Sequence, residues 1–207
     1  MKVFGITLGS FQTNCYLVAE GREVIIIDPG DDGDKIVGLV EKLRLCPVMV
    51  VNTHCHIDHI GANDYIRELF GIPLGVHKYD APFLMDPDRN LSSFLDSPAS
   101  FSPPDIEFVG DEELNVGGGT LRVIWSPGHT PGSICIGGED FVITGDLLFY
   151  DGVGRTDFPG GDERALRNSL AKIVDMVDPS CYVYPGHGPS GRMEEILEFN
   201  LFLRELV

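Results

Sequence analysis

Histidine and aspartate residues recur in this sequence directly after apolar runs that are typical of β-strands. They follow the runs 48–51, 121–125, 141–144 and 181–184, and they are His54, His56, Asp58, His59, His129, Asp146 and His187. Imidazole and carboxylate groups are ligands for Zn²⁺, iron and Mn²⁺. Ligands of open α/β sheets bind outside the carboxyl ends of strands, so four such ends can share one rim. The sequence therefore predicts a metal centre assembled from distant segments.

The spacing within residues 54–59 indicates two adjoining groups of ligands. Residues two apart in an extended segment lie on the same side, so His54 and His56 face one way. A turn into a following helix then directs Asp58 and His59 toward the same pocket from another position. The motifs His-Glu-x-x-His and Pro-Cys-x-x-Cys of other zinc enzymes are absent from the sequence. The sixth histidine, His77, stands apart and is predicted to be structural.

The segments that must position these residues alternate between strands and helices. Apolar runs predict strands over 2–9, 13–19, 24–27, 47–51, 72–77, 106–109, 120–125, 133–137, 140–144 and 181–184. Helical spacing predicts four helices, whose apolar positions are Ile36, Val37, Val40 and Leu43; Ile66, Leu69 and Phe70; Leu166, Leu170, Ile173, Val174 and Val177; and Ile196, Phe199, Phe202, Leu203 and Leu206. Because each helix is apolar on one side only, helices are expected to cover sheets in a layered α/β architecture.

Two further local features belong to this pattern. Asp162 is predicted to cap the start of the third of these helices. Residues 79–85 are expected to form a helical turn, whereas residues 86–104 contain four prolines and show no period. An unstructured segment of that length is either a lid over a site or a mobile surface loop.

Composition bounds the class of protein. The chain has 207 residues, of which 43% are hydrophobic and 23% charged, so residues 1–207 are expected to form a single globular domain. Asp and Glu total 32 against 15 Lys and Arg, which gives a net charge of −17. Such a chain repels phosphate backbones and anionic lipids, so neither nucleic-acid binding nor membrane binding is expected.

Cysteine usage and the absence of targeting signals indicate the compartment. The five cysteines are odd in number and form no Cys-x-x-Cys pair, which argues against a disulfide framework and against a cysteine-built zinc site. Cys135 and Cys181 lie in apolar runs and are expected to be buried. No apolar run approaches the roughly 18–20 residues that span a bilayer, and no leader peptide is evident. A cytoplasmic protein is expected.

The chain resembles the metallo-β-lactamase superfamily over essentially its whole length. The motifs that carry the resemblance appear in order as Ile27-Asp28-Pro29-Gly30, Thr53-His54-Cys55-His56-Ile57-Asp58-His59, Pro127-Gly128-His129-Thr130-Pro131-Gly132, Thr144-Gly145-Asp146 and Pro185-Gly186-His187-Gly188. The resemblance implies an αββα sandwich of two mixed β-sheets flanked by helices, with metals at one edge of the sheets.

The same resemblance implies two divalent metal ions and assigns their ligands. One ion is expected on His54, His56 and His129, and a second on Asp58, His59 and His187, with Asp146 bridging both. Asp28 is expected to position ligands, or else to act as a turn residue at a strand end. Zinc is the expected metal, and iron and manganese remain open because His/Asp sites accept all three.

Within the superfamily, the chain looks like the glyoxalase II-like branch of small hydrolases, named for hydroxyacylglutathione hydrolase. The stretches 145–149, 154–161, 185–189 and 200–203 carry this likeness. It implies hydrolysis of a small-molecule thioester such as S-D-lactoylglutathione, with a metal-bridging hydroxide as nucleophile. Asp58 is the expected catalytic residue, which orients that nucleophile or accepts its proton. A thiol leaves readily because its pKa is only about 8.5, so no dedicated acid is required.

Three alternatives remain open at this stage. Arg155 is expected to bind the carboxylate of the thiol part of the substrate, or else to pair with Asp157 or Asp151. A second alternative is a mononuclear Fe(II) persulfide dioxygenase, because such enzymes share the fold and a similar Gly-Arg-Thr-Asp-Phe stretch. Near the end of the chain, however, those enzymes have a segment similar to Pro-Ala-His-Asp, whereas this chain has Pro185-Gly186-His187-Gly188. The third alternative is a non-catalytic metal-binding protein, which would bind metal fully without turnover.

Overall fold

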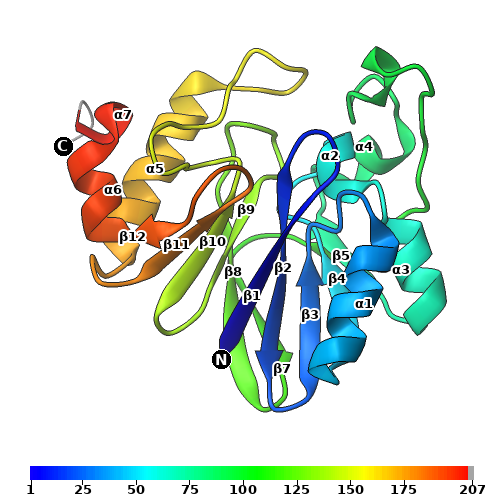
Figure 1. Ribbon diagram of the computed structural model, residues 1–207. Helices are drawn as coiled ribbons and strands as arrows, with labels where there is room; N and C mark the ends of the chain where they lie inside the picture. Colours follow the sequence, from blue (N-terminus) through cyan, green and yellow to red (C-terminus); the bar gives the residue numbers. More distant parts are fainter. Residues whose placement is uncertain (205–207) are drawn as a thin grey trace.

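Two six-stranded β-sheets packed face to face form the centre of the computed structural model, which describes residues 1–204 (Figure 1). The first sheet has the order β1 (Lys2–Leu8), β2 (Thr13–Glu20), β3 (Glu23–Ile27), β4 (Cys46–Val51), β5 (Leu74–His77) and β6 (Ile106–Phe108). The second has the order β12 (Gly191–Arg192), β11 (Tyr182–Pro185), β10 (Phe141–Gly145), β9 (Ile134–Gly137), β8 (Gly119–Trp125) and β7 (Glu112–Val116). Each sheet combines parallel and antiparallel pairs, so the predicted mixed sheets are confirmed.

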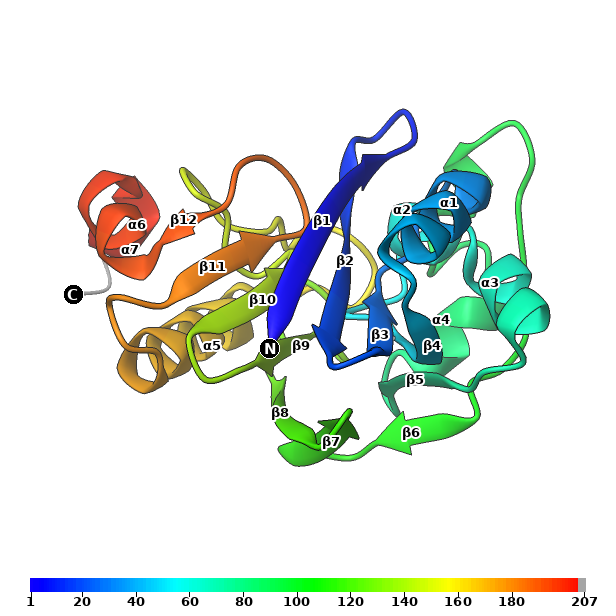
Figure 2. The same cartoon turned by 60° about the horizontal axis from the view of Figure 1, so that its bottom comes forward.

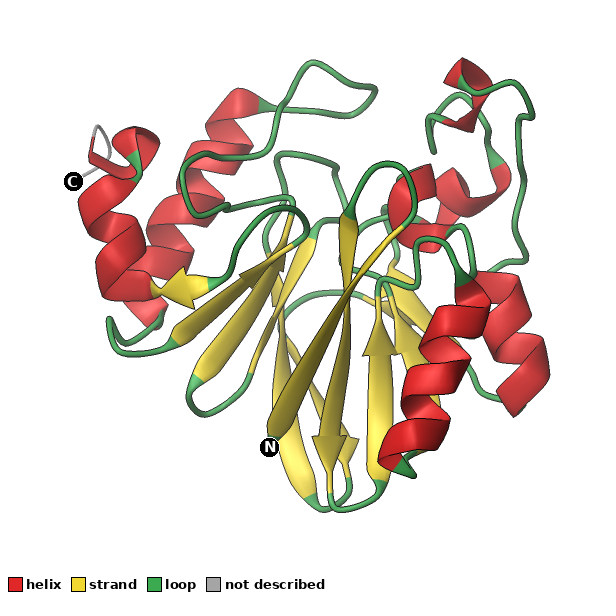
Figure 3. Ribbon diagram, in the orientation of Figure 1, coloured by secondary structure: helices red, strands yellow, loops and turns green. Residues whose placement is uncertain are grey.

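Helices cover the outer face of each sheet, which confirms the αββα sandwich (Figures 2 and 3). On the first sheet lie α1 (Gly33–Leu43) and α3 (Asn63–Phe70), with the short helices α2 (Ile57–Ile60) and α4 (Ala81–Met85) near its upper edge in Figure 1. On the second lie α5 (Glu163–Met176), α6 (Met193–Phe199) and α7 (Leu201–Arg204). Asp162 caps α5 as predicted, since its side chain accepts a hydrogen bond from Ala165 N at 2.9 Å.

The central strands are apolar throughout because both of their faces are covered. In β3, Val24 and Ile26 pack with α1 and α3, whereas Ile25 and Ile27 pack between the two sheets. All four side chains are at most 1% exposed. Burying such a side chain is worth about 1.5–3 kcal/mol, so a continuous apolar run rather than an alternating one marks a strand of this layer.

The strand directions bring the ends singled out in the sequence to one edge. In the second sheet β8 and β10 are both antiparallel to β9, and β11 is parallel to β10, so these three strands end together. In the first sheet β3 and β4 are parallel and end beside the start of β2. The loops that follow these ends gather at the top of the molecule in Figure 3.

The sequence patterning predicts every strand except β7 and the two-residue β12. β7 forms a hairpin with β8 in which Val116 pairs with Gly119. The connecting glycines, Gly117 and Gly118, have φ values of +55° and +87°. Two successive residues with positive φ are typical of a type I′ turn, which is why glycine occupies both positions.

The expectation of an unstructured segment over 86–104 is wrong in part. The segment contains a 3₁₀ turn, Ser92–Phe94, and its Asn90 and Ser92 are fully buried. Asn90 Nδ2 donates to Ala99 O at 3.0 Å, and Ser92 Oγ exchanges hydrogen bonds with the Ala99 backbone. These internal bonds fix the conformation of the segment.

The closing helix is also different from the prediction. It is divided at Asn200, whose buried side chain donates to Phe149 O and Gly152 O and accepts from Phe202 N. A side chain that satisfies the backbone in this way ends one helix and starts the next. Phe199 and Phe202 are 57% and 53% exposed, so they do not face the core as predicted. Leu69 of α3 is likewise 51% exposed, and Leu206 lies outside the described residues.

All five cysteines are free, and Cys135 and Cys181 are buried as predicted. Among residues 1–204, no helix combines the length and apolar character that crossing a bilayer requires.

Candidate metal centre

Seven side chains from four strand ends converge at the upper edge of the sandwich. Their candidate ligand atoms form three overlapping groups, each with all atoms within 4.8 Å of one another: His54, His56 and His129; His54, His59 and Asp146; and Asp58, His59 and His187. All seven residues singled out in the sequence are therefore brought together. We call the first of these the histidine group and the third the aspartate group.

The histidine group is entirely buried. His54, His56 and His129 are 1%, 3% and 3% exposed. His129 Nε2 lies 3.0 Å from His56 Nδ1. Two nitrogen ligands of one tetrahedral zinc ion, each 2.0–2.1 Å from the metal, are about 3.4 Å apart. The three rings are close enough to share one ion.

The aspartate group has a similar spacing and contains a carboxylate. Asp58 Oδ2 lies 3.5 Å from His59 Nε2 and 3.2 Å from His187 Nε2. The side chain of His187 is 29% exposed, whereas that of His59 is fully buried. This group therefore faces the solvent on the side of His187.

Asp146 lies between the two groups. Its Oδ1 is 3.4 Å from His59 Nε2, and its Oδ2 is 3.7 Å from His129 Nε2 and 3.6 Å from His187 Nε2. One carboxylate therefore reaches nitrogen atoms on both sides, which is the geometry that a bridging ligand requires.

Several buried polar atoms of this cluster have no hydrogen-bond partner within the described part of the chain. They are His54 Nε2, His56 Nε2, His59 Nε2 and Asp146 Oδ1. A buried polar atom without a partner costs about 1–3 kcal/mol, so such atoms gathered at one place need a shared partner. Cations bound within the two groups would satisfy His54 Nε2, His59 Nε2 and Asp146 Oδ1, whereas His56 contacts His129 Nε2 through its other ring nitrogen, Nδ1. The residues present therefore fit a metal centre.

Electrostatics keep two members of the histidine group, His54 and His56, neutral. Burial lowers the pKa of His54 well below its ordinary value, and the nearby imidazole of His59 adds to the effect. Burial and the neighbouring His129 together lower the pKa of His56 to about 3. A neutral imidazole offers the lone pair that binds a metal, so these rings are in the required protonation state.

In the aspartate group, neighbouring carboxylates and imidazoles shift one another's pKa values. Burial opposes a charge on His59, but Asp58 and Asp146 outweigh burial and raise its pKa. In return, His59 and His187 hold the pKa of Asp58 below its ordinary value despite burial. His59 also lowers the pKa of Asp146. Both carboxylates are therefore ionised at neutral pH and attract a positive charge.

The comparison with known families agrees with this geometry. Residues 8–187 match the family model described as the metallo-beta-lactamase superfamily. The chain belongs to this superfamily. It is 36% identical to a probable metallo-hydrolase, YqgX of Bacillus subtilis, with 91% of each chain covered. It is 31% identical to the hydroxyacylglutathione hydrolase GloC of Haemophilus influenzae, with 98% of each chain covered.

Solved structures of the superfamily superpose closely on this structure. The B3 metallo-β-lactamase BLEG-1 gives a TM-score of 0.92 at 35% identity, with 98% of this chain and 99% of that chain covered. TTHA1623 in a di-iron-bound form gives 0.85 at 35% identity, covering 97% and 100%. ETHE1 from Myxococcus xanthus gives 0.83 at 27% identity, covering 99% and 85%.

In this member of the superfamily, Asp28 supports the cluster from the end of β3. Its backbone is left-handed, with φ of 53°, a conformation that costs energy for a residue other than glycine. The carboxylate accepts hydrogen bonds from Thr53 N and Thr53 Oγ1, both at 2.7 Å, and contacts His59 Nδ1 at 3.0 Å. Asp28 therefore orients a candidate ligand and the loop that follows β4.

Asp80 is a support that the sequence reasoning missed. It precedes α4, where an aspartate is expected to cap a helix, but its side chain makes no capping bond. Instead the buried carboxylate accepts from Cys55 N at 3.1 Å, from Thr130 Oγ1 at 2.8 Å and from Gly132 N at 2.7 Å. It thereby ties the loop after β4 to the loop after β8, which together carry the histidine group.

The start of β2 supports the aspartate group, and this too was missed. Thr13 Oγ1 donates to Asp58 Oδ2 at 3.0 Å. Asn14 Nδ2 donates to Pro185 O and Gly188 O, on either side of His187. Within the same loop, a Cβ on Gly186 would lie 2.1 Å from Asp146 Oδ1, so only glycine fits beside the cluster. Thr13 and Asn14 are polar side chains at the start of a buried strand, and this is the sequence signal that could have identified them.

Arg155 lies beside the cluster, whereas His77 lies apart from it. The Arg155 guanidinium forms two 2.6 Å hydrogen bonds with Asp157, and Asp151 is not its partner. Arg155 also lines a cavity of about 580 Å³ above the cluster, and its carbonyl accepts from His129 Nδ1 at 2.7 Å. His77 belongs to none of the three ligand groups and stacks on Trp125, with ring centroids 5.4 Å apart.

Proposed function

We propose that this member of the superfamily is a metal-dependent hydrolase that cleaves thioesters such as S-D-lactoylglutathione. The observation that carries the proposal is a complete aspartate group, joined to the histidine group through Asp146. The proposed ligands are His54, His56 and His129 for one divalent cation and Asp58, His59 and His187 for another, with Asp146 shared. Zinc is the proposed metal, and iron and manganese suit the same donors.

The cations would supply one kind of chemistry, namely lowering the pKa of water toward neutrality and polarising a carbonyl. Asp58 contributes the proton acceptor. It is ionised, lines the cavity and is fixed by Thr13 Oγ1 on one side and His187 Nε2 on the other. A carboxylate in that position orients an attacking water and takes its proton.

The residues that line the cavity indicate which leaving group the site can release. Apart from the proposed ligands, Arg155 is the one charged side chain among the described residues that line the cavity. Beyond the proposed ligands, no carboxylic acid or lysine among these lining residues is available to protonate a departing amine. A thiol needs no such donor because its pKa is only about 8.5, which favours a thioester over an amide.

Arg155 is the proposed anchor for the carboxylate of the thiol part of the substrate. Its pairing with Asp157 lies at the surface, where the two side chains are 58% and 66% exposed, and such pairs contribute little stability. A bidentate guanidinium can therefore exchange this partner for a substrate carboxylate. We expect Arg155→Ala to raise KM about threefold to tenfold for S-D-lactoylglutathione with little change in kcat. Unchanged KM and kcat would remove Arg155 from the site.

The test of the function combines metal content with turnover. Purified protein is loaded with zinc, iron or manganese in turn, the ions per chain are counted, and hydrolysis of S-D-lactoylglutathione is measured beside oxygen uptake with glutathione persulfide. Thioester hydrolysis with two ions per chain is expected. Oxygen uptake with one iron per chain would instead identify a persulfide dioxygenase. Two bound ions without turnover of any thioester would identify a metal-binding protein that is not a catalyst.

A further inference from the structure

The cavity above the cluster has apolar walls. Its lining beyond the proposed ligands and Arg155 consists of eight side chains without a polar group: Phe11, Ile57, Leu91, Phe94, Leu95, Phe149, Val153 and Phe158. A hydroxyl group of a bound molecule would find no side-chain hydrogen-bond partner among these eight. A volume of about 580 Å³ is within the range of small-molecule sites and leaves room for an extended apolar group.

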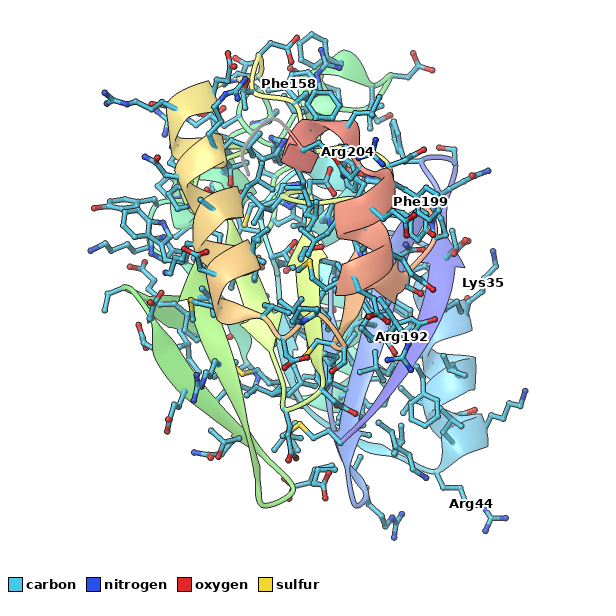
Figure 4. The ribbon with its side chains drawn as sticks, turned by 90° about the vertical axis from the view of Figure 1, so that its left-hand side faces the viewer. Lys35, Arg44, Phe158, Arg192, Phe199 and Arg204 are labelled. Carbon is cyan, nitrogen blue, oxygen red and sulfur yellow. The ribbon has the colours of Figure 1, made fainter. Side chains whose placement is uncertain are left out.

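Aromatic rings flank the cluster on two sides. The ring centroid of Phe158 lies 5.7 Å from that of His56, and the ring of Phe149 lies 6.1 Å from that of His187. Phe158 projects from the loop before α5 at the top of the molecule (Figure 4). A substrate carbonyl held at the cluster would therefore have an aromatic surface on either side.

The mouth of the cavity exposes apolar side chains to solvent. Phe11, Phe94 and Leu95 are 53%, 77% and 38% exposed. Phe11 comes from the turn between β1 and β2, and the other two come from the segment 86–104. An exposed cluster of this kind costs solvation free energy and marks a surface that binds an apolar group.

The mouth is held in place before any ligand binds. Ser92 N donates to the buried Asn90 Oδ1 at 2.9 Å, and Ala99 N donates to Ser92 Oγ at 2.8 Å. Asn90 O accepts from Ile57 N at 2.8 Å, which ties the segment to the loop that carries the ligands. These hydrogen bonds hold the backbone that carries Phe94 and Leu95 in place. Less conformational entropy is therefore lost when a ligand packs against these two side chains.

We propose that the site selects thioesters whose acyl group is an apolar chain or ring, in preference to a short hydroxyacyl group such as lactoyl. The inference rests on the proposed thioester hydrolase function. The carbonyl lies at the cluster and the thiol part extends toward Arg155, whose guanidinium stacks on Phe158 with Cζ 3.9 Å from the ring centroid. The acyl chain therefore runs past Phe149 toward Phe94.

The first experiment varies the acyl group and keeps the thiol constant. The metal-loaded protein is assayed with S-acetyl-, S-butyryl-, S-hexanoyl- and S-D-lactoylglutathione. Each buried methylene is worth about a fourfold gain in binding, so kcat/KM is expected to rise with chain length, to roughly 20-fold or more for hexanoyl over acetyl. The kcat/KM for S-D-lactoylglutathione is expected to be close to that for S-acetylglutathione. A flat or falling series overturns the inference and leaves the hydrolase function standing, whereas no turnover of any thioester overturns both.

The second experiment compares two exposed phenylalanines. Phe94→Ala shortens the apolar wall, and it is expected to lower the hexanoyl-to-acetyl ratio of kcat/KM about fivefold. Phe199→Ala is the matched control, because Phe199 is 57% exposed on α6 and lines none of the cavities near the cluster (Figure 4). The ratio in that variant is expected to equal that of the wild type. An unchanged ratio in Phe94→Ala, or an equal fall in both variants, overturns the inference.

Discussion

The two ligand groups are similar in spacing but differ in how they are stabilised. The histidine group is buried, its His54 and His56 are neutral, and a buried carboxylate, Asp80, supports it from behind. The aspartate group contains a carboxylate of its own and is partly exposed on the side of His187, and it is supported by Thr13, Asn14 and the buried carboxylate of Asp28. Buried carboxylates therefore lie behind both groups, and only the aspartate group has a carboxylate that it does not share. A cation bound at the histidine group would have the shared Asp146 as its charged ligand, so the loops that aim its imidazoles matter most there.

Removing Asp146 should have the largest effect, because this residue belongs to both groups. Asp146→Ala is expected to lower kcat/KM more than 1,000-fold and to release both ions, since neither site keeps its shared carboxylate. His56→Ala and His187→Ala should each release one ion. Counting ions per chain in the three purified variants checks this. Two ions retained by Asp146→Ala would show that the groups do not share a ligand.

Removing the carboxylate of Asp80 should mainly affect the histidine group. In Asp80→Ala, Cys55 N, Gly132 N and Thr130 Oγ1 lose their buried acceptor. Each loss costs about 1–3 kcal/mol, and relief of the buried charge offsets a part of it, so the free energy of unfolding should fall by about 2–4 kcal/mol. Metal affinity should fall about 10–100-fold at one site only.

Urea unfolding and metal titration measure these two effects, with Asp175→Ala as the control. Asp175 is an exposed aspartate of α5, and its replacement should change neither quantity. Equal weakening of both metal sites in Asp80→Ala would break the contrast between the groups.

The pH dependence of stability offers a sharper test of the buried charge. Burial raises the pKa of Asp80 to about 6 from its ordinary value of 3.8, against the effect of its hydrogen bonds. A carboxyl group that binds its proton more tightly in the folded state contributes stability below about pH 4 and loses that contribution as the pH rises through 6.

Asp80→Asn does not titrate, so the unfolding free energy of the wild type relative to this variant should fall by about 2 kcal/mol between pH 4 and pH 7. Urea unfolding of the metal-free proteins at both pH values measures the change. A constant difference would mean that Asp80 is ionised throughout and that the histidine group has no titrating support.

Changing the support of the aspartate group should have a smaller effect. Thr13→Val removes the hydroxyl that donates to Asp58 Oδ2 and keeps the shape of the side chain. Because this group is partly solvated, the affinity for one ion should fall only about tenfold, with stability nearly unchanged. Metal titration checks this, and Thr120→Val in the distant hairpin is the control. A loss as large as that of Asp80→Ala would contradict the comparison.

The sequence predicts the sandwich and the cluster because both depend on local patterns. Strands buried on both faces appear as continuous apolar runs, such as 24–27, and ligands that follow such runs must lie at a sheet edge. The edge strand β7 escapes this reasoning because its run is not continuously apolar: the exposed polar residues Glu113 and Asn115 alternate with Leu114 and Val116, which face inward. Its signal was the glycine pair that forms the turn to β8.

What escaped prediction depends on contacts between distant segments. Asp80 reads as a helix cap, and only the folded chain shows that its carboxylate faces the loops of Cys55 and Thr130. The apolar mouth combines Phe11 with Phe94, which are 83 residues apart in the printed sequence. No periodicity in either segment indicates that they line one cavity.

The chain order of these parts has a consequence for synthesis on the ribosome. Thr13 forms a β-bridge with His187, so a segment that emerges early pairs with one made 174 residues later. The segment that carries His54, His56, Asp58 and His59 leaves the exit tunnel long before His129, Asp146 or His187 exists. For most of translation the nascent chain displays an incomplete set of imidazoles with unused lone pairs. Stable capture of a metal pair must therefore wait until His187 has been made, which couples loading of the complete centre to formation of the second sheet.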